Sequence, residues 1–238
     1  MEVKPTHVYH LAHYGGNRGQ VDSTMIRRVI IDGTAFLYQA CIKVGGVEAI
    51  INAGSSSEYG AKLKPMREDM LAEPNTEYGI AKLWATVYGE HLRREKGLPI
   101  TTLRLFSVYG PYEAATRFFP AVILSLLEGR PPQLANPNTA RDFVYVDDVV
   151  EALMMAVDKP RGVYNVGTGV QSTLGEAMDI IQSALDSTMT LSWGTDVGRG
   201  MNDTEFWKAD ITNTKNKLQW QSVTSLSEGI KRTIFWLK

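Results

Sequence analysis

A tyrosine and a lysine one helical turn apart form the clearest chemical signal in the sequence. Tyr78 and Lys82 stand at positions i and i+4, so both side chains would lie on one face of a helix. A nearby ammonium lowers the pKa of a phenol, which would let Tyr78 act as a general acid or base near neutral pH. The spacing alone is equally typical of an ordinary exposed helix pair, and its setting in the chain has to decide between the two.

Three consecutive serines precede this pair along the chain. Ser55, Ser56 and Ser57 follow an apolar segment that reads as a buried strand, which would place them in a loop at the carboxyl end of a sheet. A hydroxyl there can donate a hydrogen bond to a substrate oxygen that faces the tyrosine. Without Tyr78 and Lys82 the serines would be interpreted as a plain turn.

The composition narrows the class of protein. The 238 residues carry a net charge of −1 and are 44% hydrophobic, which suits one full domain, or one large domain with a small appendage. This balance argues against nucleic acid or an anionic membrane as the main partner. Cys41 is the single cysteine, and no Cys/His spacing suggests a metal site. No apolar run resembles a signal peptide or a membrane span, so we expect a cytoplasmic protein.

Strands and helices alternate along the chain, and the strands are apolar throughout. This pattern predicts an α/β fold with a Rossmann-like, doubly wound parallel sheet, whose ligands bind beyond the carboxyl ends of the strands. A looser C-terminal part predicts a small substrate lobe, packed by Trp193, Trp207 and Trp220. We divide the chain into a partial Rossmann-like domain, 1–110, and an interleaved remainder of the sheet with the lobe, 111–238. The expected strands are 6–12, 47–53, 100–106, 142–146 and 163–166, and the expected helices are 24–44, 78–96, 117–129, 149–157, 173–184 and 225–237.

A glycine-rich phosphate loop of the GxGxxG type does not occur in the printed sequence. Gly15-Gly16-Asn17-Arg18-Gly19 has the wrong spacing, and Gly167-Thr168-Gly169 lacks its third glycine. Because each βαβ unit takes about 30 residues, two further crossovers before Val8 would need roughly 60 residues. We therefore expect an N-terminally truncated sheet, with the phosphate loop encoded upstream of Met1.

Taken together and in order, the motifs of the chain resemble the extended short-chain dehydrogenase/reductase family of nucleotide-sugar epimerases, dehydratases and reductases. The resemblance covers nearly the whole chain. It rests on Val8–Ala12, Asp32-Gly33-Thr34, the serine loop, the YxxxK pair, Arg104–Pro111, Arg141–Asp148, Tyr164–Gly167 and the C-terminal stretch from Ala209 to Gly229.

The resemblance implies a catalytic set and a cofactor. Tyr78 would be the acid/base, Lys82 would hold the nicotinamide ribose and tune Tyr78, and Ser55 would polarise the reacting hydroxyl. Leu11 and Ala12, with Tyr78 and Lys82, would contact the cofactor, which would be NAD or NADP. The cofactor would exchange hydride with C4 of the sugar, while the protein orients both.

The resemblance also implies a substrate with a diphosphate, a nucleotide-diphosphate sugar. Arg141 and Arg199 match positions where the family binds the diphosphate, and guanidinium groups suit phosphate oxygens. Ser107 stands where relatives often carry Asn against the sugar phosphate. Ser56 is the reserve choice for the serine that contacts substrate. We expect a homodimer as the assembly.

Two departures from the family pattern limit the reaction. Ser56 and Ser57 replace the Asp-Glu pair typical of the dehydratases, and Glu58 is displaced from that position, which disfavours 4,6-dehydration. Ile30 stands where a polar-relay Asn is usual. We therefore predict an NAD(P)-dependent nucleotide-sugar epimerase or 4-keto reductase. The alternative is a non-catalytic remnant that binds a nucleotide sugar or a partner subunit.

Overall fold

A parallel four-stranded sheet forms the centre of the computed structural model, which describes residues 4–17, 19–194 and 204–238. The strand order is β1-β2-β3-β7 and every pairing is parallel. All residues of β2 are buried, as expected for a strand covered on both faces. The predicted Rossmann-like parallel sheet is thereby confirmed. Its strands are β1 (His7–His10), β2 (Ala49–Ser55), β3 (Ile100–Leu105) and β7 (Val163–Val166).

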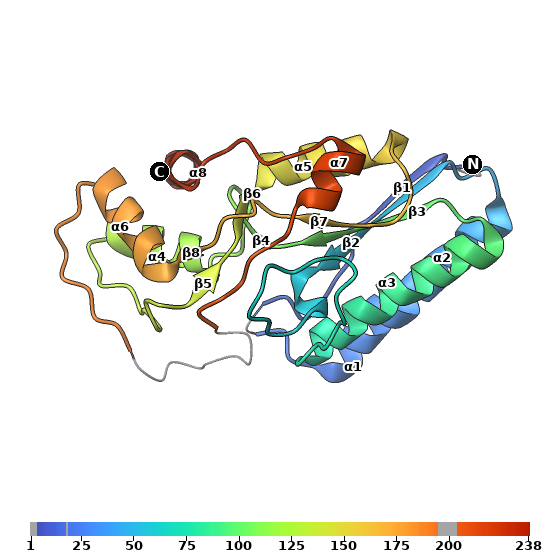
Figure 1. The fold of residues 1–238 in the computed structure, drawn as a ribbon. Coiled ribbons are helices and arrows are strands. Elements are labelled where there is room, and N and C mark those ends of the chain that lie inside the picture. The colour runs from blue at the N-terminus through green and yellow to red at the C-terminus, as the bar shows by residue number, and fades with distance from the viewer. Residues whose placement is uncertain (1–3, 18, 195–203) are drawn as a thin grey trace.

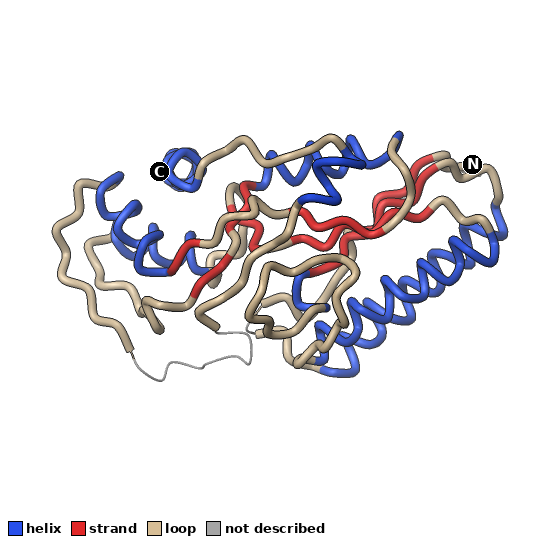
Figure 2. Tube along the Cα trace, viewed as in Figure 1, coloured by secondary structure: helices blue, strands red, loops and turns tan. Residues whose placement is uncertain are grey.

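Helices cover the two faces of this sheet (Figures 1 and 2). The crossover from β1 to β2 and the crossover from β2 to β3 lie on one face, and they hold α1 (Ser23–Ile26), α2 (Gly33–Val44) and α3 (Glu77–Lys96). The opposite face carries α5 (Val146–Met155) and α7 (Thr212–Leu218). None of the helices in the described part of the chain is long and apolar enough to cross a membrane.

The predicted helix 24–44 forms, but it is widened in its middle. Asp22 accepts hydrogen bonds from the amides of Thr24 and Met25 at its start, and a π-helical turn, Arg27–Asp32, separates α1 from α2. Ile30, within this turn, is buried against small side chains of α3. The position where an asparagine was expected therefore serves packing in this chain.

A lobe of three helices lies at the end of the molecule opposite the N-terminus (Figure 1). It contains α4 (Phe118–Leu127), α6 (Leu174–Ala184) and α8 (Leu226–Leu237), whose apolar sides share one core. Short ladders connect it to the sheet. They are the parallel pair β4 (Ser107–Tyr109) and β6 (Phe143–Tyr145) and the antiparallel pair β5 (Ala140–Arg141) and β8 (Ser172–Thr173).

Two expectations about this region were wrong in part. The strand predicted at 142–146 pairs with β4 and not with the main sheet, because the chain leaves the sheet after β3 and continues as β4. Trp193 does pack on the lobe, but Trp220 is buried between the sheet and α5, and Trp207 packs with Tyr59 below the serine loop. The division of the chain at residue 110 stays a prediction.

Candidate active site

The first turn of α3 is fixed directly against the serine loop. Thr76 caps the helix, since its hydroxyl accepts a hydrogen bond of 3.0 Å from the amide of Gly79. Gly79 packs so closely that a Cβ there would stand 2.5 Å from the carbonyl oxygen of Ser57. Only glycine allows this approach, and it brings Tyr78 next to Ser55 at the carboxyl end of β2.

Tyr78 lies in a buried environment that the sequence did not predict. Burial raises the pKa of its phenol, while the Ser55 hydroxyl and the Arg117 guanidinium act in the opposite direction and Glu58 reinforces the rise. The expected lowering of this pKa by Lys82 was therefore wrong for the structure as it stands. The groups that favour the phenolate are Ser55 and Arg117, both of which face the ring from other elements.

Lys82 lies one turn further along α3 with its ammonium 5.9 Å from the centre of the Tyr78 ring. The ammonium donates a hydrogen bond of 2.7 Å to the carbonyl oxygen of Ala53 in β2. Burial lowers the pKa of Lys82 to about 8, against an opposing effect of Glu58. The lysine is thus held in place by the strand that ends in Ser55.

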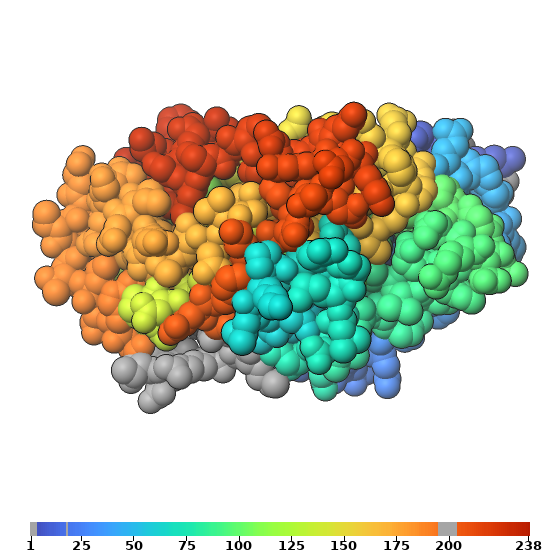
Figure 3. All heavy atoms as spheres, viewed as in Figure 1, coloured from blue at the N-terminus to red at the C-terminus, as the bar shows by residue number. Residues whose placement is uncertain are grey.

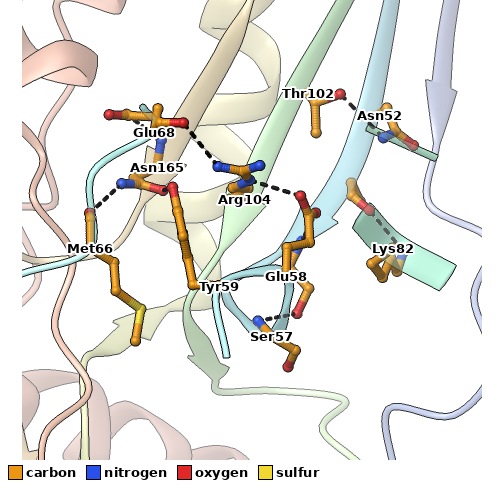
Figure 4. A network of polar contacts seen from close by, with 12 residues as sticks. Asn52, Ser57, Glu58, Tyr59, Met66, Glu68, Lys82, Thr102, Arg104 and Asn165 are labelled. Carbon is orange, nitrogen blue, oxygen red and sulfur yellow. Dashed lines mark hydrogen bonds and ion pairs between the residues drawn. The ribbon is translucent and has the colours of Figure 1, made fainter. Parts of the chain in front are cut away.

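Directly after the three serines, Glu58 forms a buried ion pair with Arg104 of β3 (Figure 4). One carboxylate oxygen of Glu58 accepts a hydrogen bond of 2.8 Å from the backbone amide of Ser55. The other accepts one of 2.7 Å from Nε of Arg104, whose guanidinium lies 4.5 Å from the Tyr59 ring centre. Burial raises the pKa of the Glu58 carboxyl against the stabilising charge of Arg104. Glu58 is therefore a positioning residue and not an acid/base of the site.

Asn165 ties the loop after the serines to β7. Its Oδ1 accepts a hydrogen bond of 2.7 Å from the Tyr59 hydroxyl, and its Nδ2 donates a hydrogen bond of 2.7 Å to the carbonyl oxygen of Met66 (Figure 4). The segment that precedes α7 lies across the same loop, where Met66 pairs with Ala209 (Figure 3). The motif around Asn165 was part of the resemblance, but its contacts could not be predicted because they join distant parts of the chain.

The chain that leaves β1 runs over Tyr78. Leu11 and Ala12, the expected cofactor contacts, stand at the carboxyl end of this strand. His10, directly before them, shares a hydrogen bond of 2.8 Å with the Thr34 hydroxyl, and burial together with the charge of Lys82 lowers its pKa to about 4. A neutral, hydrogen-bonded His10 fits a structural role.

A pocket of about 490 Å³ opens between this chain segment and the lobe. Ser107 and Arg141 both line it, as the resemblance requires of residues that contact substrate. The Arg141 guanidinium donates a hydrogen bond of 2.7 Å to the Ala140 carbonyl oxygen and lies 5.6 Å from the Trp207 ring centre. Arg199, the second expected phosphate ligand, lies outside the described residues.

Ser56 is turned away from Tyr78. Its hydroxyl accepts a hydrogen bond of 3.0 Å from the indole of Trp207. Of the three serines, Ser55 is therefore the one that faces the phenol.

Asp142 is a key residue of the site region that the sequence analysis did not single out. Its buried carboxylate accepts hydrogen bonds from the amide and the hydroxyl of Thr168, at 2.7 Å each, and from the amides of Gly169 and Ala209, at 3.0 Å each. An acidic residue followed by an apolar strand was a signal that could have revealed it. It fixes the loops beside Arg141.

Comparison with known proteins agrees with this geometry. The sequence profile of the NAD dependent epimerase/dehydratase family matches residues 1–167. An uncharacterized UDP-glucose epimerase of Bacillus subtilis is 27% identical over 205 aligned positions, which cover 84% of this chain and 64% of that protein. UDP-glucuronate 4-epimerase 1 of Arabidopsis thaliana is 28% identical over 253 positions, which cover 97% of this chain and 58% of that protein. The chain thus spans less than two thirds of the length of both relatives.

A solved structure shows the same arrangement of elements. UDP-glucuronic acid 4-epimerase of Bacillus cereus, crystallised with UDP-glucuronic acid and NAD, superposes with a TM-score of 0.89 at 26% identity. The match covers 98% of this chain and 75% of that chain.

Proposed function

The chain belongs to the NAD dependent epimerase/dehydratase family, and on that premise we propose that it acts as an NAD-dependent 4-epimerase of a UDP-linked sugar, with 4-keto reduction as the related reaction. The observation that carries the proposal is the convergence of Ser55, Tyr78 and Lys82 at the carboxyl end of β2, beside the pocket that holds Arg141. In parallel α/β sheets this edge is where ligands bind.

The proposed roles follow from the contacts of each side chain. Tyr78 removes the proton of the sugar 4-hydroxyl as a general base and returns a proton to the same oxygen as a general acid when the alcohol is formed again. Ser55 shares a hydrogen bond with the same sugar oxygen and holds it against the phenol. Lys82 is a buried cation with three N–H donors, of which one is used by Ala53, so that the others can meet a ligand hydroxyl.

The residues of this chain fit the nicotinamide half of NAD. Leu11 and Ala12 directly follow β1, and the buried ammonium of Lys82 lies 5.9 Å from the centre of the Tyr78 ring, where it would hold the ribose hydroxyls. When bound, NAD supplies a hydride acceptor and donor for sugar C4. No segment of the printed sequence has the GxGxxG pattern that would bind the pyrophosphate.

The pocket suits the nucleoside diphosphate. Arg141 supplies a cation beside Ser107, and both line the cavity that leads away from Tyr78. Charge-assisted bonds from guanidinium to phosphate are about twice as strong as bonds between neutral groups. Arg199 is proposed as a second phosphate ligand from the resemblance alone.

We also propose a homodimer that forms through α2 and α3. Phe36 on α2 is 73% exposed, and Ile80 and Val87 on α3 are 53% and 57% exposed. The side chain of Gln39 on α2 donates a hydrogen bond of 2.8 Å to the Tyr88 hydroxyl on α3, which links the two helices into one surface. Apolar side chains gathered on neighbouring helices are typical of an interface between subunits. The cytoplasmic location remains a prediction from composition.

Comparison of the turnover of UDP-glucose with NAD by the protein and by its Tyr78→Phe variant tests the function. Removal of the phenol oxygen should slow hydride transfer by about 10² to 10⁴, the usual contribution of a positioned acid/base, while UDP binding is kept. Rapid-mixing absorbance of the reduced nicotinamide measures this step.

Tyr88→Phe, on the same helix, is the matched control and should react at the parent rate. Equal rates for Tyr78→Phe and the parent protein would refute the catalytic assignment. Binding of UDP-glucose with no turnover under any condition would favour the binding-only alternative.

A further inference from the structure

Glu113 lines the pocket, and one of its carboxylate oxygens is buried without a hydrogen-bond partner among the described residues. Its side chain is 12% exposed and it lines the cavity together with Arg117 and Arg141. Oε1 accepts a hydrogen bond of 3.0 Å from Nε of Arg117, whereas Oε2 is buried and accepts no bond from any described residue. A buried carboxylate oxygen without a hydrogen bond costs free energy, and this cost falls when a donor forms a hydrogen bond with it.

Arg117 anchors this carboxylate next to the reacting end of the pocket. Nη1 of Arg117 donates a hydrogen bond of 3.1 Å to the carbonyl oxygen of Gly16. Gly16 lies over Tyr78, because a Cβ on this glycine would stand 3.9 Å from the ring atom Cζ that carries the phenol oxygen. The Glu113–Arg117 pair is therefore attached to the chain segment that covers the proposed catalytic tyrosine.

The position of Glu113 and Arg117 near Tyr78 determines which part of a nucleotide sugar they can contact. The reacting sugar carbon has to face Tyr78, so the Gly16 end of the pocket would hold the sugar ring. The diphosphate carries negative charge and is repelled by a carboxylate, whereas a sugar hydroxyl is a neutral donor. Burial raises the pKa of Glu113, while Arg117 and the Gly110 amide favour its charged form.

We propose that Oε2 of Glu113, held in place by Arg117, accepts a hydrogen bond from a hydroxyl of the sugar ring, which makes Glu113 a specificity residue for the sugar and not for the nucleotide. The inference rests on the proposed function, since it needs a nucleotide sugar in this pocket. No covalent step is involved, and the ligand hydroxyl adds a hydrogen bond to a carboxylate whose charged form Arg117 and the Gly110 amide already favour.

Calorimetric titration of the parent protein and of Glu113→Gln with UDP and with UDP-glucose tests this inference. Loss of a hydrogen bond to a charged group should weaken UDP-glucose binding about tenfold or more. UDP binding should stay the same or tighten, because a negative charge leaves the neighbourhood of an anion. Glu113→Asp keeps the charge but withdraws the carboxylate, and it should show the same selective loss.

Glu128→Gln is the matched control. Glu128 also pairs with an arginine, Arg130, but it is exposed and does not line the pocket, so this variant should bind both ligands like the parent. Parallel weakening of UDP and UDP-glucose, unchanged UDP-glucose binding in both Glu113 variants, or an equal loss in Glu128→Gln would overturn the inference. A parent protein that binds neither ligand would instead refute the proposed function, and the role of Glu113 with it.

Discussion

At the scale of single residues, the identity of the candidate catalytic set could be predicted and its environment could not. Tyr78 and Lys82 share a helix face because of their spacing, and that relation is local. Burial of the Tyr78 phenol, the opposing effect of Arg117 and the ion pair of Glu58 with Arg104 depend on elements far apart in the sequence. The sequence showed only that Glu58 is displaced from the Asp-Glu position of the dehydratases, and its two buried partners could be found only in the structure.

The buried ammonium of Lys82 makes stability depend on pH. Burial lowers its pKa from 10.5 to about 8, so between these values the unfolded chain binds the proton and the folded chain does not. Stability of the parent protein should then rise as pH increases from about 8 to about 10.5. A pKa shift of this size corresponds to about 3 kcal/mol of unfolding free energy. A variant without the ammonium would gain this energy but would lose the hydrogen bond to Ala53, which is worth about 1 kcal/mol.

Lys82→Met removes this titration. The variant should be more stable than the parent by about 2 kcal/mol at pH 7, should equal it at about pH 9.5, and should be less stable by about 1 kcal/mol at pH 10.5. Urea unfolding at pH 7, 9 and 10.5 measures the difference. A variant that is less stable by the same amount at all three values would show that the ammonium is not destabilised by burial.

At the scale of elements, long periodic segments could be predicted and short ones could not. Helices α3 and α8 follow from their apolar spacing, and they begin within one residue of the predicted positions. The polar helix α7 has no such pattern, because its lysines and Asn216 face solvent, Asn213 donates a hydrogen bond to the Val163 carbonyl oxygen, and few of its residues are buried. The pairing of β6 with β4 could not be predicted, because the local sequence of a strand does not encode which neighbouring strand it pairs with.

The turn at Gly15 is the element that fits most closely over Tyr78. Gly15 has a φ of +101°, and a Cβ there would stand 2.9 Å from Ile26 and 3.2 Å from the Tyr78 ring. Gly15→Ala should therefore lower the free energy of unfolding by about 1 to 3 kcal/mol and displace the tyrosine, so that turnover also falls.

Gly19→Ala is the control for this turn, since a Cβ there meets nothing within 4 Å and its backbone is not in the left-handed region. We expect its stability to stay within about 0.5 kcal/mol of the parent. Denaturant unfolding and single-turnover kinetics should separate the two variants. Equal behaviour of both would mean that the turn does not press on Tyr78.

At the scale of the whole molecule, the candidate site is assembled from three parts of the chain that meet only in the folded state. The sheet brings Ser55, α3 brings Tyr78, and the lobe side of the pocket brings Arg141. The chain passes repeatedly between sheet and lobe, since β7 returns to the sheet after α5 and α7 packs on it (Figure 1). The order of the motifs predicted the fold, whereas the path of the chain between the lobe and the sheet could be established only from the structure.

The proposed homodimer is a property of the whole molecule, and one charge on its interface should abolish it. Val87 is 57% exposed near the middle of α3, so Val87→Glu keeps the fold of the subunit but places a carboxylate inside the proposed contact. Sedimentation velocity should give a dimer for the parent protein and a monomer for this variant. Val223→Glu, at a 76% exposed site outside α2 and α3, should remain dimeric. A parent protein that sediments as a monomer at all concentrations, or a Val87→Glu variant that stays dimeric, would show that the α2 and α3 surface is not where two copies meet.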